Sequence, residues 1–258
     1  MYFIAQEAAM LSGFNLNELF IFPIRDQEAR KHFLLGCLIY LAGFFIPIVP
    51  WLIVAGYNAI LVRQIWNGEK PHLVKWGHWE SLFTDGARML GIRLIYSSPL
   101  LILFAVLFLL SFVFPFFSIS LQNSSDPNFG TMYMLWALLL AGISLLMMPL
   151  SLAVGLLVPA AEIHMIVKDD FRAGLQFKEW WLIFKNNWGG FVVALAILYG
   201  LMMVMSFAMQ ILFMTIVLIC LVPFLMAAIS MYSAVIQYVA YAKAYKDGQD
   251  KVSMTVAP

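Results

Sequence analysis

The sequence predicts an all-α integral membrane protein that passes several times through the bilayer, and three observations lead to this fold class. Hydrophobic residues make up 63% of the 258 residues and charged residues only 11%, whereas soluble domains are about half apolar and about a quarter charged. Long stretches contain neither a charged residue nor a histidine, and the basic residues lie in short segments between them. A soluble fold of this size has too little polar surface to cover so much apolar material.

The first apolar stretch is interrupted by two prolines, Pro47 and Pro50. Proline removes a backbone donor and breaks helix continuity, so we expect two short helices, 33–46 and 51–66. At 1.5 Å per residue each is shorter than the roughly 30 Å hydrocarbon core. This short hairpin, residues 33–66, is therefore expected either to re-enter the membrane or to cross a thinned bilayer.

Four longer apolar segments follow, and each has the roughly 20 residues that a spanning helix needs. Two spans are expected at 94–117 and 131–166, and the last two form a final hairpin at 189–243. Together with the short pair, this gives about six transmembrane or re-entrant helices in three hairpins. We treat the chain as a single membrane domain, residues 1–245, which begins with an interfacial N-terminal segment at 1–32 and is followed by a cytoplasmic tail at 246–258.

The positions of Lys and Arg predict the orientation of these helices. All 15 basic residues lie before the first helix, in two connections between the spans, or after the last span. The loop 118–130 contains none of them, and its one charged residue is Asp126. Basic residues accumulate in cytoplasmic loops. We therefore expect a multi-pass protein of the cell membrane with cytoplasmic N- and C-termini and with the loop 118–130 outside.

Two of the basic connections have the pattern of cytoplasmic amphipathic helices, at 72–90 and 174–187. A shift of 101 residues without gaps places Trp79 on Trp180 and Asp85 on Asn186, with the shared pattern Trp-x-x-(Leu/Ile)-Phe-x-(Asp/Asn). In both copies a helix precedes this segment and a new span follows it in the same orientation. The sequence therefore predicts a parallel internal duplication.

The aromatic residues of the two amphipathic segments are candidates for an interface with the membrane or a partner. Tryptophan prefers the membrane–water boundary because its ring is amphipathic. One interpretation is that these helices lie on the bilayer and fix the adjacent spans; the other is that they dock a partner or bend the membrane. The candidate residues are Trp79, Phe83, Trp180, Trp181, Phe184 and Trp188.

Several short motifs resemble one prokaryotic family. They are Phe22-Pro23-Ile24-Arg25-Asp26, Gly56-Tyr57, Gly68-Glu69, the block Trp76-x-x-Trp79-x-x-Leu82-Phe83-x-Asp85-Gly86 and, in the second half, Phe177-x-x-Trp180-x-x-Ile183. Over roughly residues 20–245 the chain is similar to the membrane family known as domain of unknown function 4013. The resemblance implies a polytopic membrane fold and implies no activity.

Four polar residues in or beside the spans are candidate intramembrane contacts. An ionisable group in a membrane is a functional candidate by default, which draws attention to Glu162 and His164. The alternative is that Glu162 reaches the interface and pairs with a basic residue such as Lys168. Gln210 and Gln237 are expected to form interhelical hydrogen bonds. The four histidines lack metal-ligand spacing and the two cysteines lie apart, so no cofactor is expected.

These observations favour a non-enzymatic role. The net charge of +1 gives no basis for nucleic-acid binding, and no catalytic constellation is visible. We expect a scaffold, an accessory subunit of a membrane complex or a membrane-shaping element, with the lipid bilayer and other membrane subunits or further copies of itself as partners. The alternative is a transporter or lipid-handling membrane protein, in which the amides in the spans would line a path.

Overall fold

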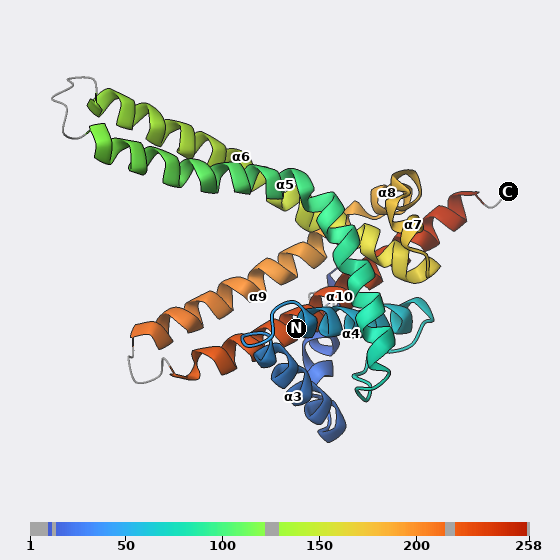
Figure 1. Cartoon of the computed structure of the whole chain (residues 1–258). Helices are drawn as coiled ribbons and strands as arrows, with labels where there is room; N and C mark the ends of the chain where they lie inside the picture. Colours follow the sequence, from blue (N-terminus) through green and yellow to red (C-terminus); the bar gives the residue numbers. More distant parts are fainter. Residues whose placement is uncertain (1–9, 12–13, 122–128, 215–219, 257–258) are drawn as a thin grey trace, which may run out of the picture. The chain divides into compact units, whose positions relative to one another are not determined.

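The computed structural model describes residues 10–11, 14–121, 129–214 and 220–256, and this part of the chain is almost entirely helical (Figure 1). The all-α fold class is confirmed. A minimal antiparallel ladder of β1 (Met10–Leu11) and β2 (Phe14–Asn15) comes first. The helices that follow are α2 (Leu16–Ile21), the 3-10 helix η1 (Phe22–Ile24), α3 (Gln27–Ala42), α4 (Val49–Trp66), α5 (Trp79–Leu121), α6 (Phe129–Lys168), α7 (Phe171–Leu175), α8 (Phe177–Asn186), α9 (Trp188–Met214) and α10 (Val222–Val256).

Four of these helices are long and apolar enough to cross a membrane. The segments lie in α5, α6, α9 and α10, and each overlaps one of the four longer spans expected from the sequence. Helices α3 and α4 are shorter, with 16 and 18 residues. The chain therefore has the helices of a membrane protein. The four segments are Trp79–Val113, Gly130–Lys168, Trp188–Ile211 and Val222–Met254.

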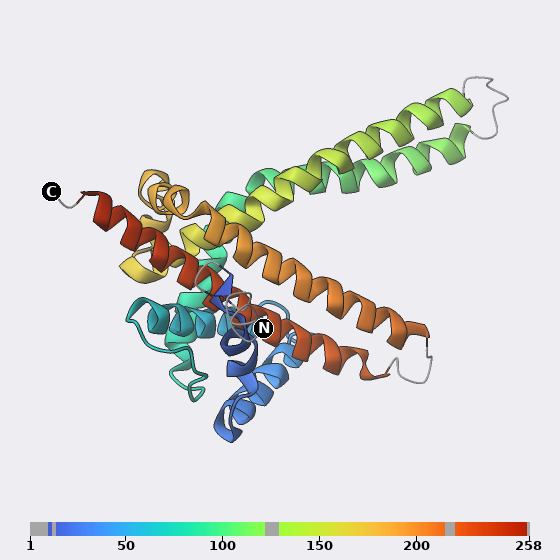
Figure 2. The same cartoon turned by 180° about the vertical axis from the view of Figure 1, so that it is seen from behind.

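The chain divides into two compact units. The second unit is Arg93–Val158, and it consists of the later part of α5 and the earlier part of α6, which run side by side in both views (Figures 1 and 2). Its large apolar side chains point mostly outward; Phe112 is 62% exposed and Leu145 is 71% exposed. Exposed apolar surface of this extent marks contact with lipid or with another protein.

The first unit, Met1–Ile92 with Pro159–Pro258, is organised around α10. This helix packs against α3, α4, α8 and α9. Ala240 and Ala244 are completely buried and let neighbouring backbones approach, while Tyr241 fills the adjoining space. Near the start of α10, in contrast, Phe224 is 59% exposed. The core of this unit therefore surrounds the second half of α10.

The break between α3 and α4 has the expected cause. Pro47 lacks a backbone donor, Ile48 has a positive φ of 72°, and Pro50 lies in the first turn of α4, where proline is tolerated. Two helices are present, as the prolines predict. Helix α3 begins earlier than residue 33, because Asp26 caps it by accepting a hydrogen bond from a backbone N–H of its first turn at 2.7 Å.

The segment 72–90 and the span 94–117 are expected as separate helices, and the structure joins them. Helix α5 is continuous over 43 residues. It begins directly after His78, whose φ of 51° ends the extended segment before it. No proline lies between residues 79 and 98, so nothing in the local sequence stops the helix there.

Two further boundaries differ from the expected ones. The segment 174–187 is divided into α7 and α8 at Gln176. Helix α10 does not end near residue 243 but continues through most of the expected tail, 246–258, as far as Val256. The charged residues that suggest a tail lie instead on the last turns of a helix.

Part of the expected interfacial segment, residues 1–9 and 12–13, lies outside the described residues. The rest of this segment packs on the first unit. Leu19 and Phe22 are buried, and the hydroxyl of Tyr232 on α10 donates a hydrogen bond to the carbonyl of Phe20 at 2.9 Å. From α2 onward this segment is thus attached to the core helix of the unit.

Candidate functional site

Helices α4 and α5 cross at two glycines. A Cβ atom at Gly56 would lie 1.8 Å from the carbonyl oxygen of Leu82, and a Cβ atom at Gly86 would lie 1.8 Å from the carbonyl oxygen of Leu52. No side chain fits at either position, so each backbone touches the other directly. Glycine is the residue that permits such close helix packing. The crossing fixes the start of α5 against α4.

Aromatic stacking and hydrogen bonds hold the segment between α4 and α5 against the neighbouring helices. The rings of Tyr57 and Trp76 are stacked, with centroids 4.0 Å apart and an interplanar angle of 12°. The Tyr57 hydroxyl donates to the carbonyl of Val74, and the Trp76 indole donates to the carbonyl of His32, each at 2.8 Å. The buried polar tips of both rings are thus satisfied, and the segment is fastened to α3 as well as to α4.

A cluster of four charged side chains joins the end of α4, the start of α5 and the end of α6. Arg63 donates to Asp85 with 2.6 Å between Nη1 and Oδ2, and its Nη2 lies 3.6 Å from Asp169. Arg88 donates to Asp169 at 3.1 Å and lies 4.0 Å from Asp85. The hydrogen bond that Arg63 donates to Asp85 raises the pKa of Arg63. The cluster has two charges of each sign and is electrically balanced.

Glu162 and His164 are buried on α6, with exposed fractions of 0% and 1%. Glu162 accepts a hydrogen bond of 2.7 Å from the hydroxyl of Tyr238 on α10. The sequence offers Glu162 either an intramembrane contact or an interfacial pair with a basic residue. Its complete burial and its bond to Tyr238 place the carboxylate inside the protein, where α6 meets α10.

His164 connects three helices. Its Nδ1 is hydrogen-bonded to the hydroxyl of Tyr245 on α10, and its Nε2 lies 3.2 Å from a carboxylate oxygen of Glu179 on α8. A neutral imidazole with its proton on Nε2 satisfies both contacts, because it donates to Glu179 and accepts from Tyr245. The side chain of Glu179 is 54% exposed. The arrangement therefore links a buried phenol to a solvent-exposed carboxylate through one histidine.

The structure separates the six aromatic residues proposed as an interface into two groups. Trp180 and Phe184 are 0% and 8% exposed, so they belong to the core of the first unit and do not form its surface. The reason is that α8 packs on α10. The other four are exposed at the surface: Trp79 by 49%, Phe83 by 43%, Trp181 by 37% and Trp188 by 63%.

The two amides proposed as intramembrane contacts lie on different helices. Gln210 is exposed on α9, and Gln237 is half-buried on α10. Within the described helices no hydrogen bond joins them. Among the described residues, no group of three or more His, Cys, Asp or Glu side chains could hold a metal ion.

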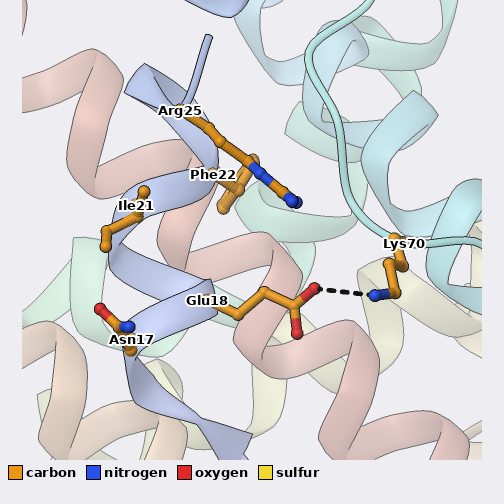
Figure 3. A pocket seen from close by; sticks show the side chains of 6 residues that line it. All are labelled: Asn17, Glu18, Ile21, Phe22, Arg25 and Lys70. Atoms are coloured by element: carbon orange, nitrogen blue, oxygen red, sulfur yellow. Dashed lines mark ion pairs between the residues drawn. The ribbon is translucent and has the colours of Figure 1, made fainter.

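A hollow of about 330 Å³ opens beside α2 and η1. It is lined by Asn17, Glu18, Ile21, Phe22, Arg25 and Lys70. Figure 3 shows the side chains of Glu18, Arg25 and Lys70 converging on it, with Nζ of Lys70 3.7 Å from Oε1 of Glu18. Sequence reasoning did not combine these residues, because Lys70 follows α4 and is far from the others in the chain.

The model of one protein family, described as "Protein of unknown function (DUF4013)", matches residues 39–214. This range is more than half of the chain. The chain belongs to this family. The resemblance drawn from the sequence motifs is thereby confirmed, although the matched range is narrower than 20–245. No curated protein and no solved structure matches the chain.

The motifs by which the chain resembles the DUF4013 family have a common place in the structure. Gly56 and Gly86 form the crossing of α4 and α5, Tyr57 stacks on Trp76, and Asp85 pairs with Arg63. The first-half motifs within the matched range thus lie around the crossing of α4 and α5. Helix α10 and the residues of α2 and η1 in the hollow lie outside the matched range.

Proposed function

We propose that this DUF4013 protein is a multi-pass membrane scaffold that holds other membrane components, or the bilayer itself, in a defined arrangement. One observation carries the proposal: the motif residues serve the packing of α4 against α5, while Trp79 and Phe83 of the same motif point outward. A scaffold needs rigidly packed helices that present an exposed binding surface. Here the packing residues and the exposed aromatic residues lie in one short stretch of chain.

Exposed apolar surface near the break between α3 and α4 supports a membrane-shaping form of this role. Phe45 is 83% exposed, and Ile46, Ile48 and Trp51 are each exposed by more than half. An apolar turn of this kind is stable in lipid or against a partner. With the short helices on either side, it would act as a wedge that enters the bilayer without crossing it.

The proposed arrangement has three hairpins, with both termini and the two amphipathic segments on the cytoplasmic side. The segregation of all 15 basic residues supports this orientation. The proposed parallel duplication also has structural support. The shift of 101 residues places Gly68 on Asp169, and these residues have positive φ values of 83° and 50°. Gly68 lies two residues after the end of α4, and Asp169 directly follows α6.

The same shift places Arg63 on His164. Each of these side chains lies near the end of its helix and binds a carboxylate of the aromatic segment that follows. Arg63 donates to Asp85, and His164 contacts Glu179. The two copies would therefore use different residue types for one structural task.

The scaffold is tested by removing the exposed aromatic pair Trp79→Ala with Phe83→Ala. Both side chains are nearly half exposed, so the fold should tolerate their loss. Covering such aromatic surface contributes on the order of a few kcal/mol to docking. We expect the double variant to insert normally but to lose partner co-purification from native membranes, or the remodelling of liposomes by the purified protein.

The matched control is Phe108→Ala with Phe112→Ala, an exposed pair with the same spacing on the same helix. This pair lies in the second unit, where lipid is the expected neighbour, so both properties should persist. The scaffold is wrong if co-purification and remodelling survive the loss of Trp79 and Phe83. A solute flux that depends on Gln210 or Gln237 would instead establish the transporter alternative.

A further inference from the structure

The hollow beside α2 and η1 has an excess of positive charge. Two cationic side chains, Arg25 and Lys70, and one carboxylate, Glu18, point into it (Figure 3). The pair between Lys70 and Glu18 is long at 3.7 Å, and Lys70 is 83% exposed, so water screens it strongly. Within the part of the chain that the structure describes, no carboxylate pairs with the guanidinium of Arg25. The site is thus suited to one additional negative charge.

The chemistry of the lining favours a phosphate oxyanion. A guanidinium presents a planar fork of donors that matches two phosphate oxygens, and an ammonium adds a point charge. Asn17 also lines the hollow. Glu18 repels a second negative charge, so a phosphodiester with a single charge fits better than a doubly charged phosphate.

The surroundings of the hollow are apolar. Phe22 is buried in its wall, whereas Ile21 and Ile24 are 43% and 44% exposed beside Arg25. Helix α3, which begins two residues after Arg25, exposes further leucines, including Leu34 at 61%. A ligand with a charged head and an apolar body could therefore place its head in the hollow and its body along these side chains.

We propose that this hollow binds the phosphodiester head of an anionic membrane phospholipid, with Arg25 as its main contact and Lys70 as a second cation. The volume of about 330 Å³ is at the lower end of the range for small-molecule sites. Basic pockets next to membrane helices are suited to lipid head groups because the anionic head and the protein cation meet at the interface. The site would anchor the N-terminal segment to the bilayer surface.

The test is native mass spectrometry of the full chain in detergent, titrated with short-chain phosphatidylglycerol. We expect one bound lipid, and we expect Arg25→Gln to weaken its binding about tenfold, as the loss of a charge-assisted contact predicts. Lys70→Gln should weaken binding less, and Arg25→Lys should restore part of it. Glu18→Gln should tighten binding, because it removes the repelling carboxylate. Lys178→Gln, an exposed lysine on α8, is the matched control and should have no effect.

Two further probes identify the source of the phosphate. Diacylglycerol, which has the chains but no phosphate, should bind no differently to the wild-type protein and to Arg25→Gln. Inorganic phosphate should displace the lipid only weakly. The proposal fails if Arg25→Gln and Lys70→Gln bind phosphatidylglycerol as the wild type does, and the assignment to a lipid fails if inorganic phosphate binds equally well. Neither result bears on the scaffold, whose test uses Trp79 and Phe83.

Discussion

Gly56 and Gly86 are the residues at which a change of one methyl group should matter most. A Cβ atom at either position would overlap a backbone carbonyl oxygen, which cannot rotate away as a side chain could. We expect Gly56→Ala and Gly86→Ala each to destabilise the protein by about 1–3 kcal/mol or more. For a chain of this size each kcal/mol lowers the melting temperature by about 2–4 °C, which thermal unfolding in detergent would detect.

Gly200→Ala on α9 is the control for this prediction. No atom outside the helix's own neighbourhood lies within 4 Å of the position that its Cβ would take, so the change should be neutral or slightly stabilising. Because Gly56 and Gly86 share one crossing, the double variant should lose less stability than the sum of the single changes. A melting temperature of Gly56→Ala equal to that of the wild type would contradict the direct contact of the two backbones.

In the first unit, buried polar residues join neighbouring helices through hydrogen bonds. Glu162 and Tyr238 join α6 to α10, and His164 joins α6 to both α8 and α10. Leaving such a buried group without its partner costs about 1–3 kcal/mol. The sequence draws attention to Glu162 and His164 because ionisable residues are rare in apolar segments, but it gives no sign of their partners, since Tyr238 and Tyr245 resemble ordinary core aromatics.

At the scale of elements, local sequence patterns predict where the helices lie, but they do not predict how the helices pack against one another. Pro47 and Pro50 predict the break after α3, and the apolar runs predict α6, α9 and α10. The shift of 101 residues aligns Trp79 with Trp180, yet Trp79 is 49% exposed and Trp180 is 0% exposed. The difference arises because α10 covers α8, and the sequence pattern within α8 does not predict that contact. The charge pattern likewise did not predict that α10 continues beyond residue 243, because a helix can extend through polar sequence.

The turn between α3 and α4 should enter the membrane without crossing it. In a variant lacking Cys37 and Cys220, we expect Ile48→Cys to resist water-soluble maleimide added from either side. Its side chain is 54% exposed in the isolated chain, so lipid or a partner, and not the protein core, would protect it. Glu69→Cys, in the polar segment after α4, should react from the cytoplasmic side. It is the positive control for the reagent.

Rapid labelling of Ile48→Cys from outside would show that α3 and α4 cross the bilayer. The wedge that supports a membrane-shaping role would then be lost, although the scaffold surface at Trp79 and Phe83 would not be affected. Labelling from the cytoplasmic side alone would place this turn in water or in an open interface. Either result is distinguishable from protection on both sides.

For the whole molecule, crossing of the membrane by all four candidate helices would place both chain ends on the same side. The matched family range contains α5, α6 and α9, while α10, the fourth of these helices, lies outside it. An even number of crossings agrees with the segregation of Lys and Arg, from which we expect the charged end of α10 and the segment after α4 to lie in the cytoplasm. The orientation of the chain can therefore be tested with few probes.

We predict that Ser124→Cys is labelled by an impermeant maleimide in intact cells, whereas Glu69→Cys and Asp250→Cys are labelled only after the membrane is permeabilised. Ser124 lies outside the described residues, in the loop that contains no basic residue. Glu69 and Asp250 are better cytoplasmic probes than the neighbouring glycines. Gly68 has a φ of 83°, and a Cβ at Gly248 would lie 2.7 Å from the carbonyl oxygen of Ile183, so a cysteine there would disturb the fold that it reports. Labelling of Asp250→Cys in intact cells, together with protection of Ser124→Cys, would reverse the orientation and place the aromatic surface of Trp79 and Phe83 outside the cell.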